Sequence, residues 1–164
     1  MTEEVFITNS FEETQKLGED FSRSHLKQGE TLTSARVIAL YGDLGSGKTT
    51  FVQGLAKGLG IKKRIISPTF IIARTYNINF KFQISNFKST PKNAKLFNHI
   101  DLYRVNSEAD LDGLGIKEIL NDPENIVVIE WAEKLKGLLP KERIEIHFKY
   151  LGENKRRITI AKIA

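Results

Sequence analysis

Apolar runs and alternating apolar and polar positions predict the strands of this chain. Residues 37–40 and 126–129 are unbroken apolar runs, a pattern typical of strands buried on both faces of a parallel sheet. Shorter runs, and alternation near the C-terminus, predict further strands. Apart from a longer hairpin, the expected strands are residues 5–7, 37–40, 65–66 and 126–129 and a C-terminal hairpin of residues 144–150 and 158–160.

A long antiparallel hairpin is predicted over about residues 70–104. Apolar and polar residues alternate strictly from Tyr76 to Ile84, and the alternation resumes from Leu96 to Leu102. The returning strand is expected to bring Asp101 close to residues 69–70, which are far away in the sequence.

Three helices are predicted from apolar residues at helical spacing. The first follows the capping-box signal of Ser10 with Glu13 and extends to about His25. The second follows a glycine-rich turn, and the third begins near Ser107, with Asp110 as its capping partner. The residues at helical spacing are Phe11, Thr14, Leu17 and Phe21 in the first helix and Phe51, Leu55 and Leu59 in the second; in the third, Leu111, Leu114 and Ile119 are expected to face inward.

Composition limits the classes of protein that remain. The 164 residues are 40% hydrophobic and include ten Phe, four Tyr and one Trp, enough for a core in a single domain spanning residues 1–164. No apolar run approaches the ~18 residues of a membrane span, and the acidic residues 1–4 do not begin a secretory signal. With no cysteine, disulfides and thiol chemistry are excluded, so a cytoplasmic protein is expected.

The charge of the chain is unevenly distributed. Between Leu44 and Ile100 there are ten basic and no acidic residues, which leaves 15 basic against 20 acidic residues elsewhere. This division indicates either an anionic partner for the middle third of the chain or a lysine-rich, solvated surface.

Residues 42–49, Gly-Asp-Leu-Gly-Ser-Gly-Lys-Thr, match the phosphate-binding pattern G-x-x-x-x-G-K-[ST] between an apolar run and a helix. Glycines let backbone N–H groups point inward around an anion, and the helix N-terminus adds partial positive charge. Lys48 is expected to bind the β- and γ-phosphates of a nucleoside triphosphate, and the Thr49 hydroxyl to bind Mg²⁺.

The sequence therefore predicts an α/β fold of the P-loop NTPase type, a central β-sheet flanked by helices with an extended β-hairpin. The expected nucleotide contacts are Phe11, Leu44, Gly45, Ser46, Gly47, Lys48, Thr49, Thr50 and Thr69.

Two acids are expected beside the phosphates. Asp101 and Glu130 each follow an apolar stretch, and ligands of open α/β sheets collect beyond the carboxyl ends of the strands. These acids and Lys48 are the candidate catalytic residues, and the acids with Thr49 are the candidate Mg²⁺ ligands. The alternatives are an ion pair with Arg104 for Asp101 and a surface position for Glu130.

Other polar motifs are less informative about the function of the protein. Thr69 is either a sensor of the γ-phosphate or a turn residue after Pro68, and Trp131 is either a core residue or a lid over the site. The three histidines show no metal-ligand spacing; His147 is expected to face solvent and His99 to act at most behind the metal ligands. Asp-Leu-Asp-Gly at residues 110–113 matches a GTPase pattern without the preceding strand or a base-reading motif, which argues against a GTPase.

Four motifs in this order resemble those of the TsaE (YjeE) family, P-loop ATPases of bacterial tRNA threonylcarbamoyladenosine biosynthesis. Besides the phosphate loop they are Ser-Pro-Thr-Phe at residues 67–70, His-Ile-Asp-Leu-Tyr-Arg at 99–104 and Glu-Trp-Ala-Glu at 130–133. Thr14 with residues 17–18 is similar to the family's N-terminal helix, which begins near the nucleotide base. Ala132 stands where proline is usual, and the segment 77–98 is longer than the family pattern.

The resemblance implies an ATP hydrolase in which Thr49 and Glu130 hold Mg²⁺, with Asp101 beside them. It also implies docking onto the TsaD–TsaB transferase complex that modifies the adenosine next to the anticodon, where hydrolysis resets the complex between turnovers. The tRNA would be contacted indirectly, through this complex, near the basic hairpin. Hydrolysis by the chain alone is expected to be slow.

Two other functions are compatible with a phosphate loop. One is a small kinase that passes the γ-phosphate to an acceptor, although Arg156 and Arg157 are the only adjacent arginines and fall in a predicted strand. The other is a non-catalytic module in which nucleotide orders the fold and the basic hairpin binds RNA or protein.

Overall fold

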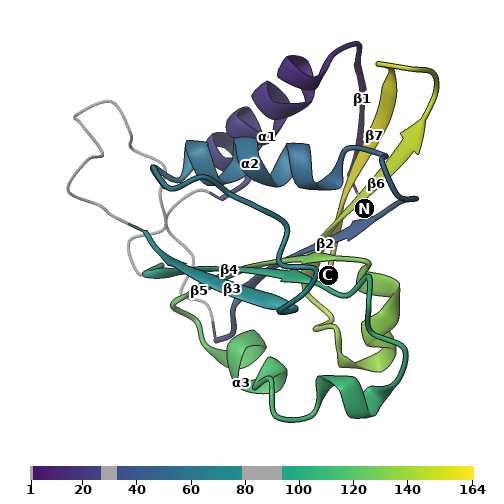
Figure 1. Ribbon diagram of the computed structural model, residues 1–164. Coiled ribbons are helices and arrows are strands. Elements are labelled where there is room, and N and C mark those ends of the chain that lie inside the picture. Colours follow the sequence, from purple (N-terminus) through teal and green to yellow (C-terminus); the bar gives the residue numbers. More distant parts are fainter. Residues whose placement is uncertain (1, 27–32, 79–93) are drawn as a thin grey trace.

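The computed structural model describes residues 2–26, 33–78 and 94–164, which form one seven-stranded sheet with helices on both faces (Figure 1). The sheet order is β1-β7-β6-β2-β5-β4-β3. The strands are β1 (Glu3–Thr8), β2 (Arg36–Tyr41), β3 (Ala73–Asn77), β4 (Leu96–Asp101), β5 (Asn125–Glu130), β6 (Arg143–Tyr150) and β7 (Arg156–Ile163). The helices are α1 (Phe11–His25), α2 (Lys48–Gly58), α3 (Ile116–Asn121) and the 3₁₀ segments η2 (Glu108–Leu111) and η3 (Ala132–Leu138).

The centre of the sheet is parallel and its borders are antiparallel. Strand β2 pairs in parallel with both β5 and β6, and β5 pairs in parallel with β4. At the two borders, β7 pairs antiparallel with β6 and β1, and β3 pairs antiparallel with β4. The carboxyl ends of β2, β5 and β4 therefore lie together at one edge of the sheet.

Consecutive apolar residues on the central strands fill two cores on opposite faces. Ile38 and Leu40 of β2 pack in the core beneath α1 and α2, whereas Val37 and Ala39 pack in the core that α3 covers. Because successive side chains point to opposite faces, a strand covered on both sides needs an unbroken apolar run. This arrangement confirms the predicted α/β class and the strands at residues 37–40 and 126–129.

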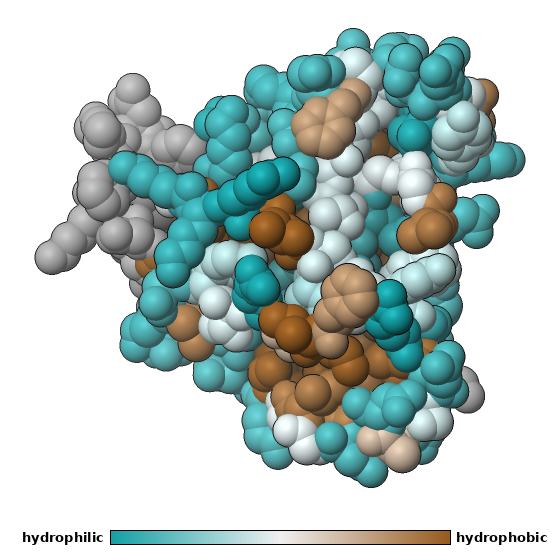
Figure 2. Space-filling view, in the orientation of Figure 1, coloured by the Kyte–Doolittle hydropathy of each residue, from teal (hydrophilic) through white to brown (hydrophobic). Residues whose placement is uncertain are grey.

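The two layers cover the sheet unequally. Figure 2 shows a largely hydrophilic surface over α1 and α2, while apolar residues gather on the visible face over the segment that carries α3. Several apolar residues of that layer, among them Leu114 and Leu139, are only partly buried. No helix in the described ranges is both long and apolar enough to cross a membrane.

Two predicted strands differ in the structure. Residues 65–66 do not pair with any strand in the described part of the chain, so the prediction of a strand there is wrong. Ile65 is nevertheless buried in the core beneath α2. The long hairpin is confirmed where β3 pairs with β4, although β3 begins only at Ala73 because Pro68 to Ile72 forms a hydrogen-bonded turn. The predicted continuation through residues 79–93 lies outside the described residues.

The predicted third helix is divided in two. Ser107 and Asp110 form the expected capping box, but η2 ends at Leu111 and α3 begins at Ile116. Gly113 and Gly115 between them have φ values of 79° and 65°, which a right-handed helix excludes. The other two predicted helices and the C-terminal hairpin are confirmed, and the Ser10 side chain accepts from the backbone N–H of Glu13 as expected.

Helices α1 and α2 cross at three glycines that allow backbone to touch backbone. A Cβ added at Gly54 would lie 1.9 Å from the carbonyl oxygen of Gln15, and one at Gly18 would lie 2.2 Å from that of Phe51. At Gly58 it would lie 1.8 Å from Ser22 Oγ. This contact holds α2, which begins at the phosphate loop, against α1.

We expect Gly54→Ala to destabilise the protein by about 2–3 kcal/mol, because its methyl group overlaps a backbone oxygen that cannot move without displacing α1. In an exposed helix the same change would stabilise. Urea unfolding measures the difference. Gly137→Ala is the matched control, since a Cβ there meets no atom within 4 Å. Equal unfolding midpoints for the two variants would contradict the close helix contact.

Candidate active site

The glycine-rich turn between β2 and α2 has the backbone of a phosphate loop. Gly42, Gly45 and Gly47 have φ values of 145°, 76° and 103°, a region that favours glycine. Gly42 is also confined by packing, because an added Cβ would lie 2.6 Å from the carbonyl oxygen of Phe148. The turn delivers the chain to the N-terminus of α2, whose first N–H groups have no partner within the helix.

Lys48, the first residue of α2, is folded back into this turn. Its ammonium group donates to the carbonyl oxygens of Gly42 at 2.5 Å and Asp43 at 2.9 Å, and it lies 4.3 Å from the centre of the Trp131 ring. Burial lowers the pKa of Lys48 below its ordinary value, while the neighbouring carboxylates, Glu130 foremost, act in the opposite direction. A buried cation is thus held among neutral oxygens at the start of the helix.

Glu130, the last residue of β5, meets Thr49 of α2. The Thr49 hydroxyl lies 2.9 Å and 3.0 Å from the two carboxylate oxygens of Glu130. The same carboxylate lies 2.8 Å from Nε2 of the fully buried His99. Since Glu130 is only 2% exposed, it is not the surface acid that was the alternative, and His99 holds its orientation from behind.

Asp101, the last residue of β4, is bound to the segment that precedes β3. Its carboxylate accepts from the hydroxyls of Ser67 and of Thr69, the latter at 2.9 Å, and from the backbone N–H of Tyr103 at 2.9 Å. The predicted closeness of Asp101 to Thr69 is therefore confirmed. The guanidinium of Arg104, the alternative partner of Asp101, instead packs over the Phe70 ring at 4.3 Å.

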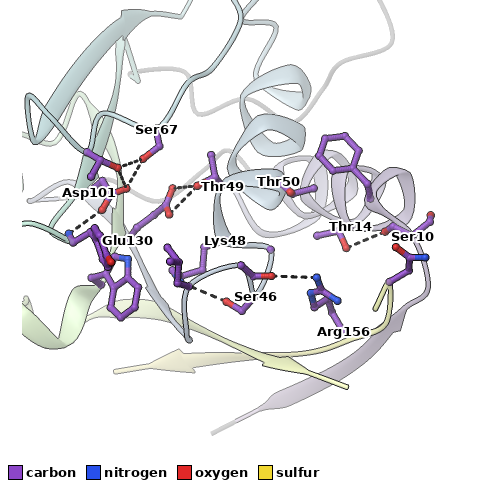
Figure 3. Close-up of a pocket in the computed structure, with 18 residues that line it drawn as sticks. Ser10, Thr14, Ser46, Lys48, Thr49, Thr50, Ser67, Asp101, Glu130 and Arg156 are labelled. Atoms are coloured by element: carbon purple, nitrogen blue, oxygen red, sulfur yellow. Dashed lines mark hydrogen bonds between the residues drawn. The ribbon is translucent and has the colours of Figure 1, made fainter. Parts of the chain in front are cut away.

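These groups surround one cavity of about 460 Å³ (Figure 3). Every residue predicted from the sequence to bind nucleotide, metal or reacting groups lines it. Those residues are Phe11, Leu44, Gly45, Ser46, Gly47, Lys48, Thr49, Thr50, Thr69, Asp101 and Glu130. The structure thus brings them together from α1, α2, the β2–α2 turn, β4, β5 and the segment before β3.

Seven further residues line the cavity: Ser10, Thr14, Ser67, Tyr103, Trp131, Asn154 and Arg156. Trp131 is partly buried: it packs against the core that α3 covers and also lines the cavity beside Lys48, so both interpretations describe part of its surroundings. Asn154 and Arg156 come from the β6–β7 hairpin and were not predicted, because no local motif marks them. Only the register of β7, which places Arg156 near the phosphate loop, reveals them.

The oxygen ligands in the cavity suit a magnesium ion whose coordination shell a bound phosphate would complete. Among the described residues, no group of three or more His, Asp or Glu side chains forms a ready metal cage. Mg²⁺ in nucleotide sites needs only one or two protein oxygens, because waters and phosphate oxygens supply the rest. The adjoining Thr49 hydroxyl and Glu130 carboxylate offer such a pair, with Asp101 in the same cavity.

The other histidines lie away from the cavity lining. His147 is exposed, as predicted, and its ring stacks on Tyr41 with centroids 4.6 Å apart. His25 stacks on Phe21 near the end of α1.

Comparisons with known proteins agree on one family. The family model for threonylcarbamoyl adenosine biosynthesis protein TsaE matches residues 8–158. The chain is 38% identical over 157 residues to the tRNA threonylcarbamoyladenosine biosynthesis protein TsaE of Rickettsia felis, covering 95% of this chain and 78% of that protein. It is 36% identical over 127 residues to the protein of that name from Bacillus subtilis, covering 77% and 70%.

A solved structure shares the fold. The crystal structure of Bacillus subtilis YdiB superposes with a TM-score of 0.71 at 26% sequence identity, covering 99% of this chain and 87% of that one. The family match extends over the phosphate loop, the Asp101 and Glu130 strands and β6, and ends within β7. This chain therefore belongs to the TsaE family of tRNA threonylcarbamoyladenosine biosynthesis proteins.

Proposed function

We propose that this protein binds Mg²⁺–ATP in the cavity and hydrolyses it in support of tRNA N⁶-threonylcarbamoyladenosine formation. The observation that carries the proposal is the contact of Thr49 with Glu130 beside the phosphate loop. It joins the start of a phosphate-binding helix to a buried acid at the end of a neighbouring strand. Such a pair is the usual means by which P-loop enzymes hold magnesium on the β- and γ-phosphates.

The phosphates would be bound by the loop itself. Backbone N–H groups of residues 44–49 line the cavity, and the N-terminus of α2 adds partial positive charge. Lys48 would leave the carbonyl oxygens of Gly42 and Asp43 for the β- and γ-phosphates, a stronger, charge-assisted interaction.

Three oxygen-bearing side chains would hold the metal and the attacking water. Thr49 and Glu130 would hold Mg²⁺, which when bound neutralises charge that develops on the phosphates. Asp101, already fixed by three hydrogen bonds, would orient the water or a metal-bound water. Thr69 shares the Asp101 carboxylate with Ser67, so a change at the γ-phosphate would be transmitted to the segment before β3.

The partner would be the TsaD–TsaB transferase complex, and tRNA would be met indirectly through it. Family membership supports this role, because the matched proteins are named for threonylcarbamoyladenosine biosynthesis. Hydrolysis would reset the complex between turnovers and would be slow in the isolated chain, since P-loop sites often need a group supplied by a partner.

The kinase and binding-module alternatives have less support. Among the described residues lining the cavity, Arg156 is the only arginine, and it lies at the end opposite Glu130, away from the position proposed for the terminal phosphate (Figure 3). Of the lysines in the basic hairpin, Lys88 and Lys92 lie outside the described residues, and Lys95 is paired with Glu124 at 2.5 Å.

We expect Glu130→Gln to reduce phosphate release from ATP by about 10²-fold or more, because a neutral amide can neither hold the metal nor assist the water. The assay measures release by the chain alone and with TsaD and TsaB. Glu118→Gln, an exposed acid on α3, is the control and should retain full activity. Absence of hydrolysis in both conditions for the unaltered protein would overturn the proposal.

We expect Thr49→Ala to weaken the Mg²⁺ dependence of hydrolysis by at least about tenfold, the effect usually seen when even an outer partner of a metal ligand is lost. A magnesium titration at fixed ATP measures it. Thr75→Ala on β3, whose hydroxyl bonds Asn98, serves as control. Unchanged magnesium dependence in Thr49→Ala would contradict the metal assignment.

We expect ATP affinity to fall as the pH rises through the alkaline range below 10.5. Burial lowers the pKa of Lys48, so the free site loses its proton in that range, whereas bound phosphate favours the protonated form. Binding should therefore take up a proton there. Calorimetry in buffers of different ionisation enthalpy measures the uptake. Lys48→Met should bind weakly and show no such uptake, and equal uptake by both proteins would refute the prediction.

A further inference from the structure

Arg156, the first residue of β7, is hydrogen-bonded to the phosphate loop. Its guanidinium donates to the carbonyl oxygen of Gly45 in that loop at 3.1 Å and to that of Gly152 in its own hairpin turn at 3.0 Å. Its plane packs over the Tyr150 ring, 4.6 Å from the ring centre. The side chain therefore links the C-terminal hairpin to the phosphate loop.

One donor of this side chain has no protein partner. The Nε–H of Arg156 is buried and unbonded among the described residues. It lies near Gly47, since a Cβ added to that glycine would lie 3.9 Å from both Cγ and Nε of Arg156 and 3.6 Å from the Thr14 methyl group. Because Nε itself is inaccessible, a ligand can reach only the remainder of this partly exposed side chain, which lines the cavity.

The position of Arg156 identifies the part of the ligand it meets. In Figure 3, Ser67, Asp101 and Glu130 lie at one end of the cavity, Ser10, Thr14 and Arg156 lie at the other, and Lys48 lies between them. In the proposed function, Lys48 and Glu130 mark the β- and γ-phosphates. The opposite end must then hold the nucleoside.

We propose that Arg156 is a specificity-determining residue that contacts the base and ribose and so distinguishes a nucleotide from inorganic polyphosphate. This inference rests on the proposed function. A guanidinium suits that task because it donates to ribose oxygens and ring nitrogens and also stacks on flat aromatic faces. The short polar side chains of Ser10 and Thr14 lie at the same end of the cavity (Figure 3).

The experiment compares two ligands that differ only in the nucleoside. Calorimetry with Mg²⁺ measures the affinity of the full chain for ATP and for inorganic tripolyphosphate. Arg156→Gln is expected to weaken ATP binding about tenfold, the usual value of a hydrogen bond from a charged group, and to leave tripolyphosphate binding unchanged. The matched control is Arg157→Gln, the exposed neighbour one position along β7, which should change neither affinity.

The outcomes separate this inference from the proposed function. If the unaltered protein binds neither ligand, the proposed function fails and this inference fails with it. If it binds ATP but Arg156→Gln weakens both ligands equally, or neither, Arg156 only supports the loop and the specificity role is refuted. Arg156→Lys, which keeps the charge at the hairpin, should bind tripolyphosphate normally and ATP more weakly; normal binding of both would also refute it.

Discussion

The parallel register of β2, β5 and β4 is the constraint on which the site depends. Glu130 pairs across the sheet with Leu40 on one side and with Asp101 on the other. The two acids and the beginning of the phosphate loop therefore leave the sheet in one row. A shift of one residue would turn each acid to the other face, because side chains alternate along a strand. The chemistry of the cavity is thus fixed by strand pairing in the core.

That row places three ionisable side chains where water is largely excluded. Lys48, Asp101 and Glu130 are all buried, and a buried charge is costly unless other groups bond it. Each has such partners: loop carbonyls for Lys48, hydroxyls and a backbone N–H for Asp101, and Thr49 with His99 for Glu130. The same hydrogen bonds that offset the cost of burying these charges also orient the groups toward a common cavity.

Glycines serve two separate purposes around this site. Those of the phosphate loop adopt backbone angles that other residues avoid, which opens a cradle for an anion. Those between α1 and α2 have ordinary angles but admit a neighbouring backbone where a methyl group would collide. The second set brings Ser10 and Thr14, at the start of α1, to the same cavity as the loop. Local turn geometry and helix packing therefore shape the same cavity.

The sequence alone determined the elements and groups whose signals are local. The apolar run before residues 42–49 showed a buried strand leading into a phosphate loop, and acids directly after apolar stretches marked Asp101 and Glu130. Only the tertiary structure decided that residues 65–66 stay unpaired, that His99 bonds Glu130, and that Arg156 reaches the loop across more than a hundred residues. These contacts depend on the register of the strands and on how distant segments are brought together, and no local pattern in the sequence indicates either.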